Sequence, residues 1–188
     1  MSSITTNDLR VGMKVEVEKE PYLIIANEFV KPGKGQAFNR IKMKNMMNGR
    51  VVEKTYKSGE KLDLADIEEN QMRFLYKEAD GAIFMDEKTF DQITISNEVL
   101  GNNQPWLMEE IIFQVILYKG VVIEVIPPTF LEMVITETSP GVRGDTSGRV
   151  LKPATTETGA KIQVPIFVEE GDRIKVDTRT GEYVSRAN

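Results

Sequence analysis

Lys34 is the residue with the clearest chemical potential, because it stands between two glycines in the segment FVKPGKGQAFNRIKMKN, residues 29–45. A lysine can act as a general base or form a Schiff base where burial or a neighbouring charge lowers its pKa. A glycine-rich turn between two apolar segments is expected to be exposed, which argues against that chemistry. Two interpretations remain: the glycines make a turn that Lys34 keeps soluble, or Lys34 projects outward as a probe or a modification target.

Other chemistries find little support in the composition. A phosphate-binding P-loop needs a longer glycine-rich run and a Lys-Ser/Thr pair that opens a helix, whereas Gly35 leads into a strand-like segment. The chain contains no histidine and no cysteine. Their absence removes the commonest metal ligand, the commonest general base and all thiol chemistry. We therefore predict no catalytic residue, no metal site and no cofactor.

The segment RIKMK, residues 40–44, places its cations on one face of an expected strand. The side-chain period of two puts Arg40, Lys42 and Lys44 together and turns the two apolar residues between them to the opposite face. One face is expected to pack. The other is expected to form a basic stripe, which either binds phosphate or is simply solvated.

The charge of the chain is uneven along its 188 residues. Residues 31–61 hold nine Lys and Arg against two acids, a net charge of +7, while residues 62–140 hold four bases against fifteen acids, a net charge of −11. Such asymmetry suggests one basic end that faces phosphate. No apolar run approaches the roughly 20 residues needed to span a bilayer, and the N-terminus lacks a signal pattern. A cytoplasmic protein without membrane contact is expected.

Short strand-like segments dominate the first third of the chain. The alternating segment GMKVEVEKE is followed by PYLIIANEFV, then by QAFNRIKMKNM and GRVVEKTYKS. This meander is typical of a small β-barrel. Residues 58–70, SGEKLDLADIEEN, are polar and acidic with little strand character, so we place a domain boundary at 64/65.

The middle of the chain predicts three strands, a helical segment and two further strands. Strands are expected on both sides of an Asp-Gly turn, and a hairpin is expected around Lys119-Gly120. Between them, Ser96 and Asn97 are candidate helix caps, and Pro105 suits the first turn of a second short helix. This order is compatible with a five-stranded barrel of the oligonucleotide-binding (OB) type.

The dipeptide Pro127-Pro128 marks the second boundary, because a double proline cannot continue a central strand. The segment after it is again all-β, and Asp177 is expected to form a turn. Two successive five-stranded units hint at a structural repeat. Trp106 and Phe113 are expected to be core residues. The predicted domains are residues 1–64, 65–127 and 128–188.

Two long stretches, EFVKPGKGQAF and VPIFVEEGDRIKVDTRTGEYVSR, strongly resemble bacterial translation elongation factor P. The middle is similar as well, at RVVEKTYKSGEK, IPPTFLEMVITETSPGVRGDTSG and KPATTETGAKIQVP. The resemblance runs from about Asn7 to Arg186, nearly the whole chain, and both signature stretches are long and specific.

The resemblance implies a fold of three small β-barrel domains in an L shape, an SH3-like (KOW-type) domain followed by two OB-fold domains. A member of this family mimics transfer RNA and binds the ribosome between the peptidyl and exit sites. It promotes peptide-bond formation where consecutive prolines stall it. It is a monomeric cytoplasmic protein and is not itself an enzyme.

By the same resemblance, Lys34 is the modified tip of a hairpin that reaches toward the peptidyl-tRNA. It looks like the branch in which a paralogue of lysyl-tRNA synthetase attaches a β-lysyl group, although another branch carries a different lysine modification. Such an extension would act by positioning the reacting ends, an effect on the order of several kcal/mol. The rest of the tip consists of Lys31, Pro32, Gly33, Gly35 and Gln36.

The other implied sites contact RNA or ribosomal protein. The stripe Arg40, Lys42 and Lys44 would meet transfer or ribosomal RNA phosphate, and Tyr183 and Arg186 would lie near the anticodon stem of peptidyl-tRNA. The acidic second domain would face the mobile stalk protein near the exit site. The loop that would approach the messenger in the exit site consists of Gly144, Asp145, Thr146, Ser147 and Gly148.

Three alternatives stay open. The first is an elongation-factor-P-like paralogue with a different tip, against which PGKGQAF argues. The second is a generic module of SH3 and OB domains that binds RNA through an unmodified lysine. It predicts salt-sensitive binding that is indifferent to Lys34→Ala. The third is an enzyme with an active lysine, which predicts that borohydride traps a carbonyl substrate at Lys34.

Overall fold

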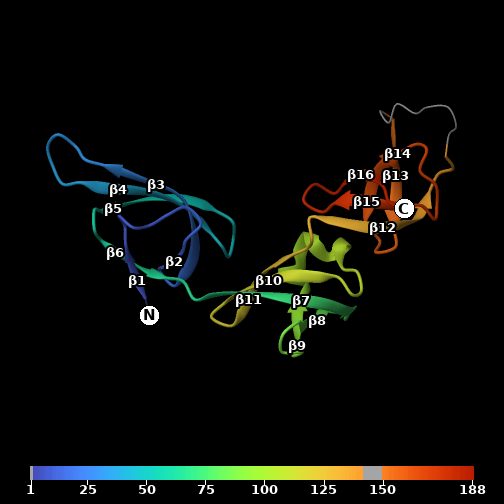
Figure 1. Ribbon diagram of the computed structural model, residues 1–188, viewed down its shortest axis with the longest axis horizontal. Helices are drawn as coiled ribbons and strands as arrows, with labels where there is room; N and C mark the ends of the chain where they lie inside the picture. Colours follow the sequence, from blue (N-terminus) through green and yellow to red (C-terminus); the bar gives the residue numbers. More distant parts are fainter. Residues whose placement is uncertain (1, 142–149) are drawn as a thin grey trace. The chain divides into compact units, whose positions relative to one another are not determined.

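The computed structural model describes residues 2–141 and 150–188, and within them the chain is almost entirely β (Figure 1). Its strands form three sheets, one of six strands and two of five. The helical segments of the described residues are two short turns, α1 (Asn97–Leu100) and η1 (Gly101–Trp106). The prediction of an all-β protein built from small barrel-like sheets is confirmed.

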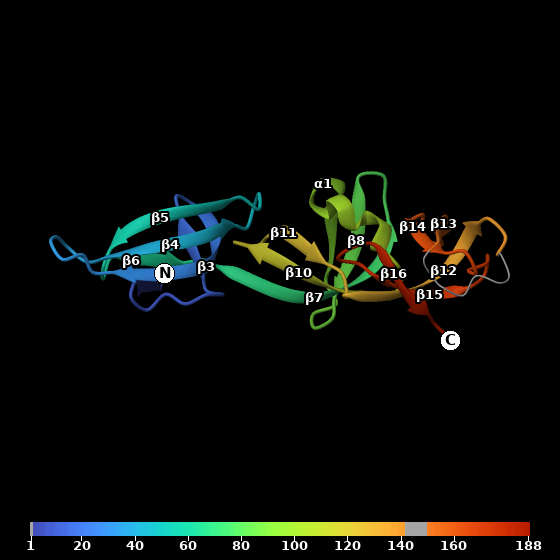
Figure 2. The ribbon, with the colours of Figure 1, turned by 90° about the horizontal axis from the view of Figure 1, so that it is seen from above.

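The N-terminal sheet has the strand order β1-β6-β2-β3-β4-β5. Its strands β3 and β4 form a hairpin, and the loop that connects them projects beyond the other strands of this sheet (Figures 1 and 2). Alternate residues point inward, so that Val15, Ile24, Ile41 and Met43 are each at most 1% exposed. The bounds are β1 Ser3–Thr5, β2 Lys14–Val17, β3 Glu20–Val30, β4 Phe38–Asn45, β5 Val51–Lys57 and β6 Lys61–Leu64.

The middle sheet has the order β11-β10-β7-β8-β9. Phe84 and Phe113 are fully buried and meet edge to face with ring centroids 5.5 Å apart. The predicted hairpin at Lys119-Gly120 is confirmed, because both residues have positive φ, as a tight two-residue turn requires. The bounds are β7 Ile67–Lys77, β8 Gly81–Asp86, β9 Gln92–Ser96, β10 Ile112–Tyr118 and β11 Val121–Ile126.

The helical segment between β9 and β10 is partly as predicted. The side chain of Ser96 caps α1 by accepting a hydrogen bond from the N–H of Val99 at 3.3 Å. Pro105 does not begin a second helix: it lies inside the 3₁₀ segment η1, one residue before its end. Because proline has no N–H to donate, the segment cannot continue as an α-helix there. Trp106 and Phe113 are buried, as expected.

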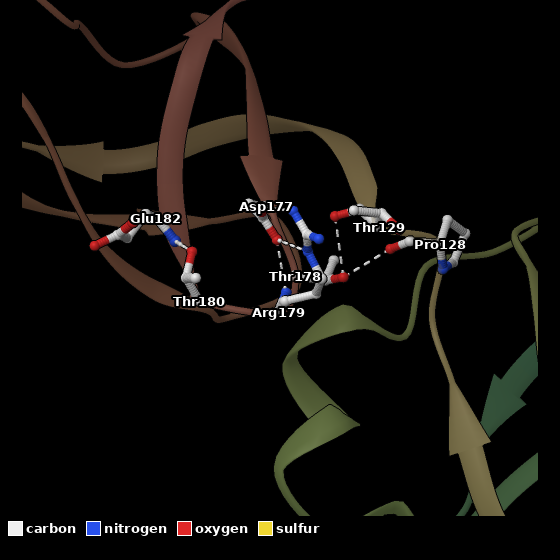
Figure 3. Close-up of polar contacts among 7 residues, drawn as sticks. All are labelled: Pro128, Thr129, Asp177, Thr178, Arg179, Thr180 and Glu182. Carbon is white, nitrogen blue, oxygen red and sulfur yellow. Dashed lines mark hydrogen bonds and ion pairs between the residues drawn. The ribbon is translucent and has the colours of Figure 1, made fainter. Parts of the chain in front are cut away.

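The C-terminal sheet has the order β14-β13-β12-β15-β16. Numbered from its own first strand, each five-stranded sheet has the order 3-2-1-4-5, which supports the structural repeat suggested by the sequence. The hydroxyl of Thr178 donates to the carbonyl of Pro128 at 2.7 Å, so the end of β15 is tied to the proline pair (Figure 3). The bounds are β12 Phe130–Thr138, β13 Leu151–Thr156, β14 Lys161–Pro165, β15 Arg173–Asp177 and β16 Glu182–Arg186.

Contacts divide the chain into two compact units, residues 1–69 with 116–124 and residues 70–115 with 125–188. The turn of the β10–β11 hairpin therefore packs within the first unit, while its base belongs to the second. The division into three domains at 64/65 and 127/128 stays a prediction.

The expectation of little strand structure in residues 58–70 is wrong. Strand β6 lies within this segment, and the long strand β7 begins at Ile67. In β6, Leu62 and Leu64 are half-buried while Lys61 and Asp63 are exposed. A strand with one solvated face can therefore carry many charges, which concealed it in the sequence.

Candidate functional site: the tip and root of the β3–β4 hairpin

The tip of the β3–β4 hairpin presents Lys34 to solvent. The two strands pair from Tyr22 opposite Asn45 out to Val30 opposite Phe38, and residues 31–37 connect them. Lys34 and both flanking glycines are exposed. Among residues 2–141 and 150–188, the Lys34 ammonium makes no ion pair or hydrogen bond. The geometry thus fits a projected cation and gives no burial that would make the amine reactive.

The two glycines of the tip differ in their backbone conformation. Gly35 has φ of +110°, a conformation that residues with a Cβ rarely adopt. Gly33 has no such φ, and a Cβ added to it would have no neighbour within 4 Å. The turn therefore requires glycine at position 35 alone. At position 33 glycine keeps the tip slender without being needed for the fold.

The root of the hairpin is fixed by a buried amide network that sequence analysis missed. The Asn27 amide donates to the carbonyls of Thr6 at 2.8 Å and Leu9 at 3.0 Å. The amide of Asn39, which is 2% exposed, donates to the Asn27 side-chain oxygen at 3.0 Å. These bonds join both hairpin strands to the segment that follows β1, and hydrogen bonds in a partly buried site restrain the geometry.

One corner of this network remains unsatisfied among the described residues. The Asn39 Oδ1 atom and the Tyr56 hydroxyl are both buried and have no hydrogen-bond partner there. The two residues lie opposite each other in the β4–β5 register. Burial raises the pKa of the Tyr56 hydroxyl, with smaller effects from Glu60 and Glu18. The phenol is therefore neutral at physiological pH and available as a donor.

The basic stripe on β4 has the predicted alternation of exposed and buried residues, but its three cations differ in whether they form ion pairs. Arg40, Lys42 and Lys44 are exposed while the intervening Ile41 and Met43 are buried. The Arg40 guanidinium lies 3.6 Å from Glu28 and 3.6 Å from Glu53, on the two neighbouring strands. Lys42 and Lys44 have no ion pair within the part of the chain that the structure describes. Their charges, like those of Lys31 and Lys34, are left open for an anion.

Tyr183 and Arg186, both on β16, are placed around Phe167 in the second unit. Tyr183 is half-buried against the C-terminal core, and burial raises its pKa. The Arg186 guanidinium lies 4.7 Å from the Phe167 ring centroid, donates to the Phe167 carbonyl at 3.1 Å and pairs with Asp172 at 3.5 Å. Arg186 is thus held rigidly while half of its side chain stays exposed.

A groove lies beside these residues, lined among others by Leu151, Pro165, Phe167 and Tyr183. It is open and partly apolar, so it could accept a flat ring or a chain segment. The predicted messenger loop, Gly144 to Gly148, lies outside the described residues.

The described residues contain no group of three or more acidic side chains that could hold a metal ion. The helices among them are too short or too polar to cross a membrane.

Comparison with known proteins supports one family along the chain. Family models match at residues 5–62 (elongation factor P KOW-like domain), 67–125 (elongation factor P OB domain) and 131–186 (elongation factor P, C-terminal). "Elongation factor P 2" of Protochlamydia amoebophila is 66% identical, and that of Chlamydia trachomatis is 59% identical. Both alignments cover 100% of this chain and 100% of the relative.

Solved structures add a likeness in fold. A eukaryotic translation initiation factor 5A from Methanococcus jannaschii has a TM-score of 0.53 at 20% identity, covering 66% of this chain and 94% of that one. An eif-5a family protein from Naegleria fowleri has a TM-score of 0.56 at 15% identity, covering 66% and 97%. Because the family models span most of the chain and the curated relatives match it from end to end, the chain belongs to the elongation factor P family.

Proposed function

We propose that this chain binds the ribosome between the peptidyl and exit sites, mimics a transfer RNA, and stimulates peptide-bond formation where consecutive prolines stall it. Family membership supports a role in translation. The observation that carries the finer proposal is the exposed Lys34, which has no partner among the described residues and stands at the end of a hairpin whose root is fixed by Asn27 and Asn39.

The proposed mechanism is positioning. Proline is conformationally restricted, so a stalled peptidyl-tRNA samples the reactive geometry poorly. A probe that holds the acceptor end in place removes part of this entropic barrier, and the effect reaches about 7–11 kcal/mol in ideal cases. The probe supplies no acid or base, in keeping with a protein that is not itself an enzyme. A hairpin fixed at its root suits this task, because a loose one would lose the advantage.

Modification of Lys34 is the second element of the proposal. We assign it a β-lysyl group, added by an enzyme related to lysyl-tRNA synthetase. A lysine flanked by glycines is open to such an enzyme when, like Lys34, it is exposed to solvent. The added group would lengthen the probe and supply further hydrogen-bond donors for the RNA backbone.

The remaining contacts divide by charge. Lys31, Lys42 and Lys44 would neutralise RNA phosphates and orient the factor without reading sequence. Tyr183 and Arg186 would approach the anticodon stem of peptidyl-tRNA, and the acidic middle segment would face the ribosomal stalk protein. All of these partners place the protein in the cytoplasm.

The test compares two lysines in exposed turns. Lys34→Ala is expected to abolish rescue of polyproline synthesis in a reconstituted translation system while folding and ribosome binding persist. Lys19→Ala is the matched control, because Lys19 is also an exposed turn lysine without an ion pair in the described residues, and it should rescue normally. Full rescue by Lys34→Ala would contradict the proposal.

Mass spectrometry of native material tests the modification. Peptides covering residues 21–40 should carry extra mass at Lys34 equal to one lysyl unit. A different adduct would keep the function and change the modifying enzyme. An unmodified Lys34, together with salt-sensitive RNA binding that ignores Lys34→Ala, would favour the generic RNA-binding module. Borohydride trapping at Lys34 would favour an enzyme.

A further inference from the structure

In the part of the chain that the structure describes, the same six-residue turn occurs three times, once in each sheet. In each turn the first residue pairs with the sixth, and the N–H of the fifth residue donates to the carbonyl of the first at 2.8–2.9 Å. The turns run from Asn45 to Arg50 between β4 and β5, from Asp86 to Asp91 between β8 and β9, and from Asp177 to Glu182 between β15 and β16.

Side chains brace the three turns in the same way. The Oδ1 atom of Asn45, Asp86 or Asp177 accepts the N–H two residues later, at 2.7–2.9 Å. The fourth residue, Asn48, Thr89 or Thr180, accepts the N–H of the sixth, at 2.9–3.3 Å. Figure 3 shows the third turn, in which Asp177 receives the Arg179 N–H and Thr180 receives that of Glu182. This bracing fixes the backbone of each turn.

The fifth residue of each turn must adopt a left-handed backbone conformation. It is Gly49 in the first turn, with φ of +76°, and Gly181 in the third, with φ of +73°. In the second turn it is Phe90, with φ of +62°. A bulky L residue is strained there, whereas glycine is not. Two turns of this chain therefore use the residue that the geometry favours, and one uses a residue that the geometry opposes.

The Phe90 side chain gains little from burial in exchange for this strain. It is 68% exposed, and its ring makes no aromatic or cation–π contact among residues 2–141 and 150–188. An exposed apolar ring also lacks the favourable free energy that burial of its surface would give. Backbone strain that no burial of the side chain compensates suggests that Phe90 contacts another molecule.

The surroundings of Phe90 define the kind of partner. Glu87 and Asp91 lie within the turn; the Glu87 carboxylate pairs with Arg73 at 2.6 Å, whereas Asp91 has no ion pair among the described residues. The surrounding residues 62–140 carry a net charge of −11. An exposed aromatic ring typically anchors an interface by filling an apolar pocket of the partner, and acidic surroundings attract a basic surface. We propose that Phe90 is an anchor that inserts into an apolar pocket on a basic ribosomal protein. This inference rests on the proposed function, because it takes the ribosome as the source of the partner.

A nucleobase is the less favourable occupant. An aromatic ring can stack on a base, but RNA brings one phosphate charge per nucleotide, and binding to it depends on neutralising cations. Lys88 is the cation within the turn, and it is outnumbered by the carboxylates beside it. Stacking on RNA is therefore an outcome that the experiment must be able to detect.

Three substitutions at one position separate the ring from the strain. Phe90→Ala removes the ring and keeps a strained residue, Phe90→Asn removes the ring and relieves the strain, and Phe90→Tyr keeps both. We expect Ala and Asn to weaken binding to purified 70S ribosomes about tenfold, and Tyr to bind as the wild type does. Only Asn should also raise the melting temperature, by about 2 °C. Unchanged binding by Ala and Asn, or a lower melting temperature for Asn, would overturn the inference.

A photoreactive phenylalanine at position 90 identifies what the ring touches. After irradiation with purified 70S ribosomes, the expected adduct is to a basic ribosomal protein. An adduct to ribosomal RNA, or none, overturns the inference. The proposed function is judged separately by Lys34→Ala: its failure appears as full rescue by that variant, whereas failure here appears as normal ribosome binding without the ring at position 90.

Discussion

Trp106 and Lys119 each connect a segment from the middle of the chain to residues of a neighbouring sheet. Trp106 does so by apolar burial and Lys119 by polar contacts. Within the second unit, Trp106 of η1 is 7% exposed and belongs to the hydrophobic core built mainly by the C-terminal sheet. Met108 and Ile111 pack against the same core. The hydroxyl of Thr158 adds one hydrogen bond, to the carbonyl of Pro105 at 2.5 Å. This attachment is mainly apolar.

Within the first unit, the β10–β11 turn meets the N-terminal barrel through polar groups. The Lys119 ammonium pairs with Glu16 at 2.9 Å, and its backbone N–H donates to the Asp66 carbonyl at 3.1 Å. The Tyr118 hydroxyl donates to the Lys19 carbonyl at 3.3 Å. Lys14 and Glu69 form a second ion pair nearby, at 3.0 Å.

The difference teaches how one chain can combine a firm attachment with an adjustable one. Burial of an indole is insensitive to salt and is lost only when the core opens. The Lys119 side chain is 46% exposed and that of Glu16 is 15% exposed, so their ion pair is partly open to solvent. Such ion pairs and single hydrogen bonds are weaker, are screened by salt and re-form easily. We expect the core that holds Trp106 to unfold as one body with its surroundings, and the Lys119 contacts to open locally at much lower free energy.

Trp106→Ala should have the largest effect on this comparison. It empties an indole-sized space in a packed core, which costs about 3–5 kcal/mol of unfolding free energy. Urea unfolding followed by far-UV circular dichroism would measure the loss. Trp106→Phe is the control, since it keeps most of the buried surface and should lose far less. Equal, small losses for both variants would mean that the indole does not contribute as a core residue.

Gly181→Ala should cause an intermediate loss of unfolding free energy, in the same core that holds Trp106. Gly181 has φ of +73°, and a Cβ there would lie 3.9 Å from the Trp106 ring, an ordinary contact. The expected loss is therefore that of backbone strain alone, about 1–2 kcal/mol. Trp106 is the only tryptophan of the chain, so its fluorescence reports unfolding of this unit directly.

Gly49→Ala provides the matched control for that substitution. Its φ is +76° in a turn of the same construction, and an added Cβ again meets only an ordinary contact, 3.8 Å from the Lys44 side chain. We expect a similar loss, located in the first unit and silent in Trp106 fluorescence. A Trp106 transition that moved equally in both variants would show that the two attachments do not unfold independently.

Local periodicity predicted much of the site, because the residues on the two faces of a strand alternate in the sequence. The alternation of residues 40–44 placed Arg40 and Lys42 outward and Ile41 inward, as the structure has them. The role of Asp177 in a turn followed from the residues beside it. The exposure of Lys34 followed from its two glycines. In each case the deciding interactions lie within a few residues.

Interactions between distant strands could not be predicted in the same way. Glu28 and Glu53 become neighbours of Arg40 through the strand register, and Trp106 joins a core formed by residues that follow it. The unusual residue of the second turn did leave a signal in the sequence. When the segments DEKTF and DTRTG are aligned, Phe90 of the first stands opposite Gly181 of the second. That correspondence gains meaning only when both segments are known to form one turn.

Removing the Glu16–Lys119 ion pair should have a smaller effect than Trp106→Ala or the two glycine substitutions. Glu16→Gln and Lys119→Met should each loosen the β10–β11 turn slightly, visible as faster amide hydrogen exchange in residues 116–124. The wild-type protein should approach the variants as salt is raised, because screening weakens the pair. A double variant that loses no more than either single variant would assign the effect to the pair. Salt-independent exchange in the wild type would contradict a polar attachment.

The smallest expected effect is the pH dependence of the same pair. The hydrogen bond from Lys119 lowers the pKa of Glu16, and burial opposes this only in part. A carboxyl with a depressed folded-state pKa stabilises the fold above its unfolded value, about 4.5, and the stabilisation disappears as the pH falls through the folded value. The difference in melting temperature between wild type and Glu16→Gln should therefore be constant from pH 7 to about 5 and shrink below that. Other acids titrate in the same range, but they are common to both proteins and cancel in the difference. A gap that widened on acidification would mean that Glu16 is destabilised as an anion, and that the turn is held by its backbone bonds instead.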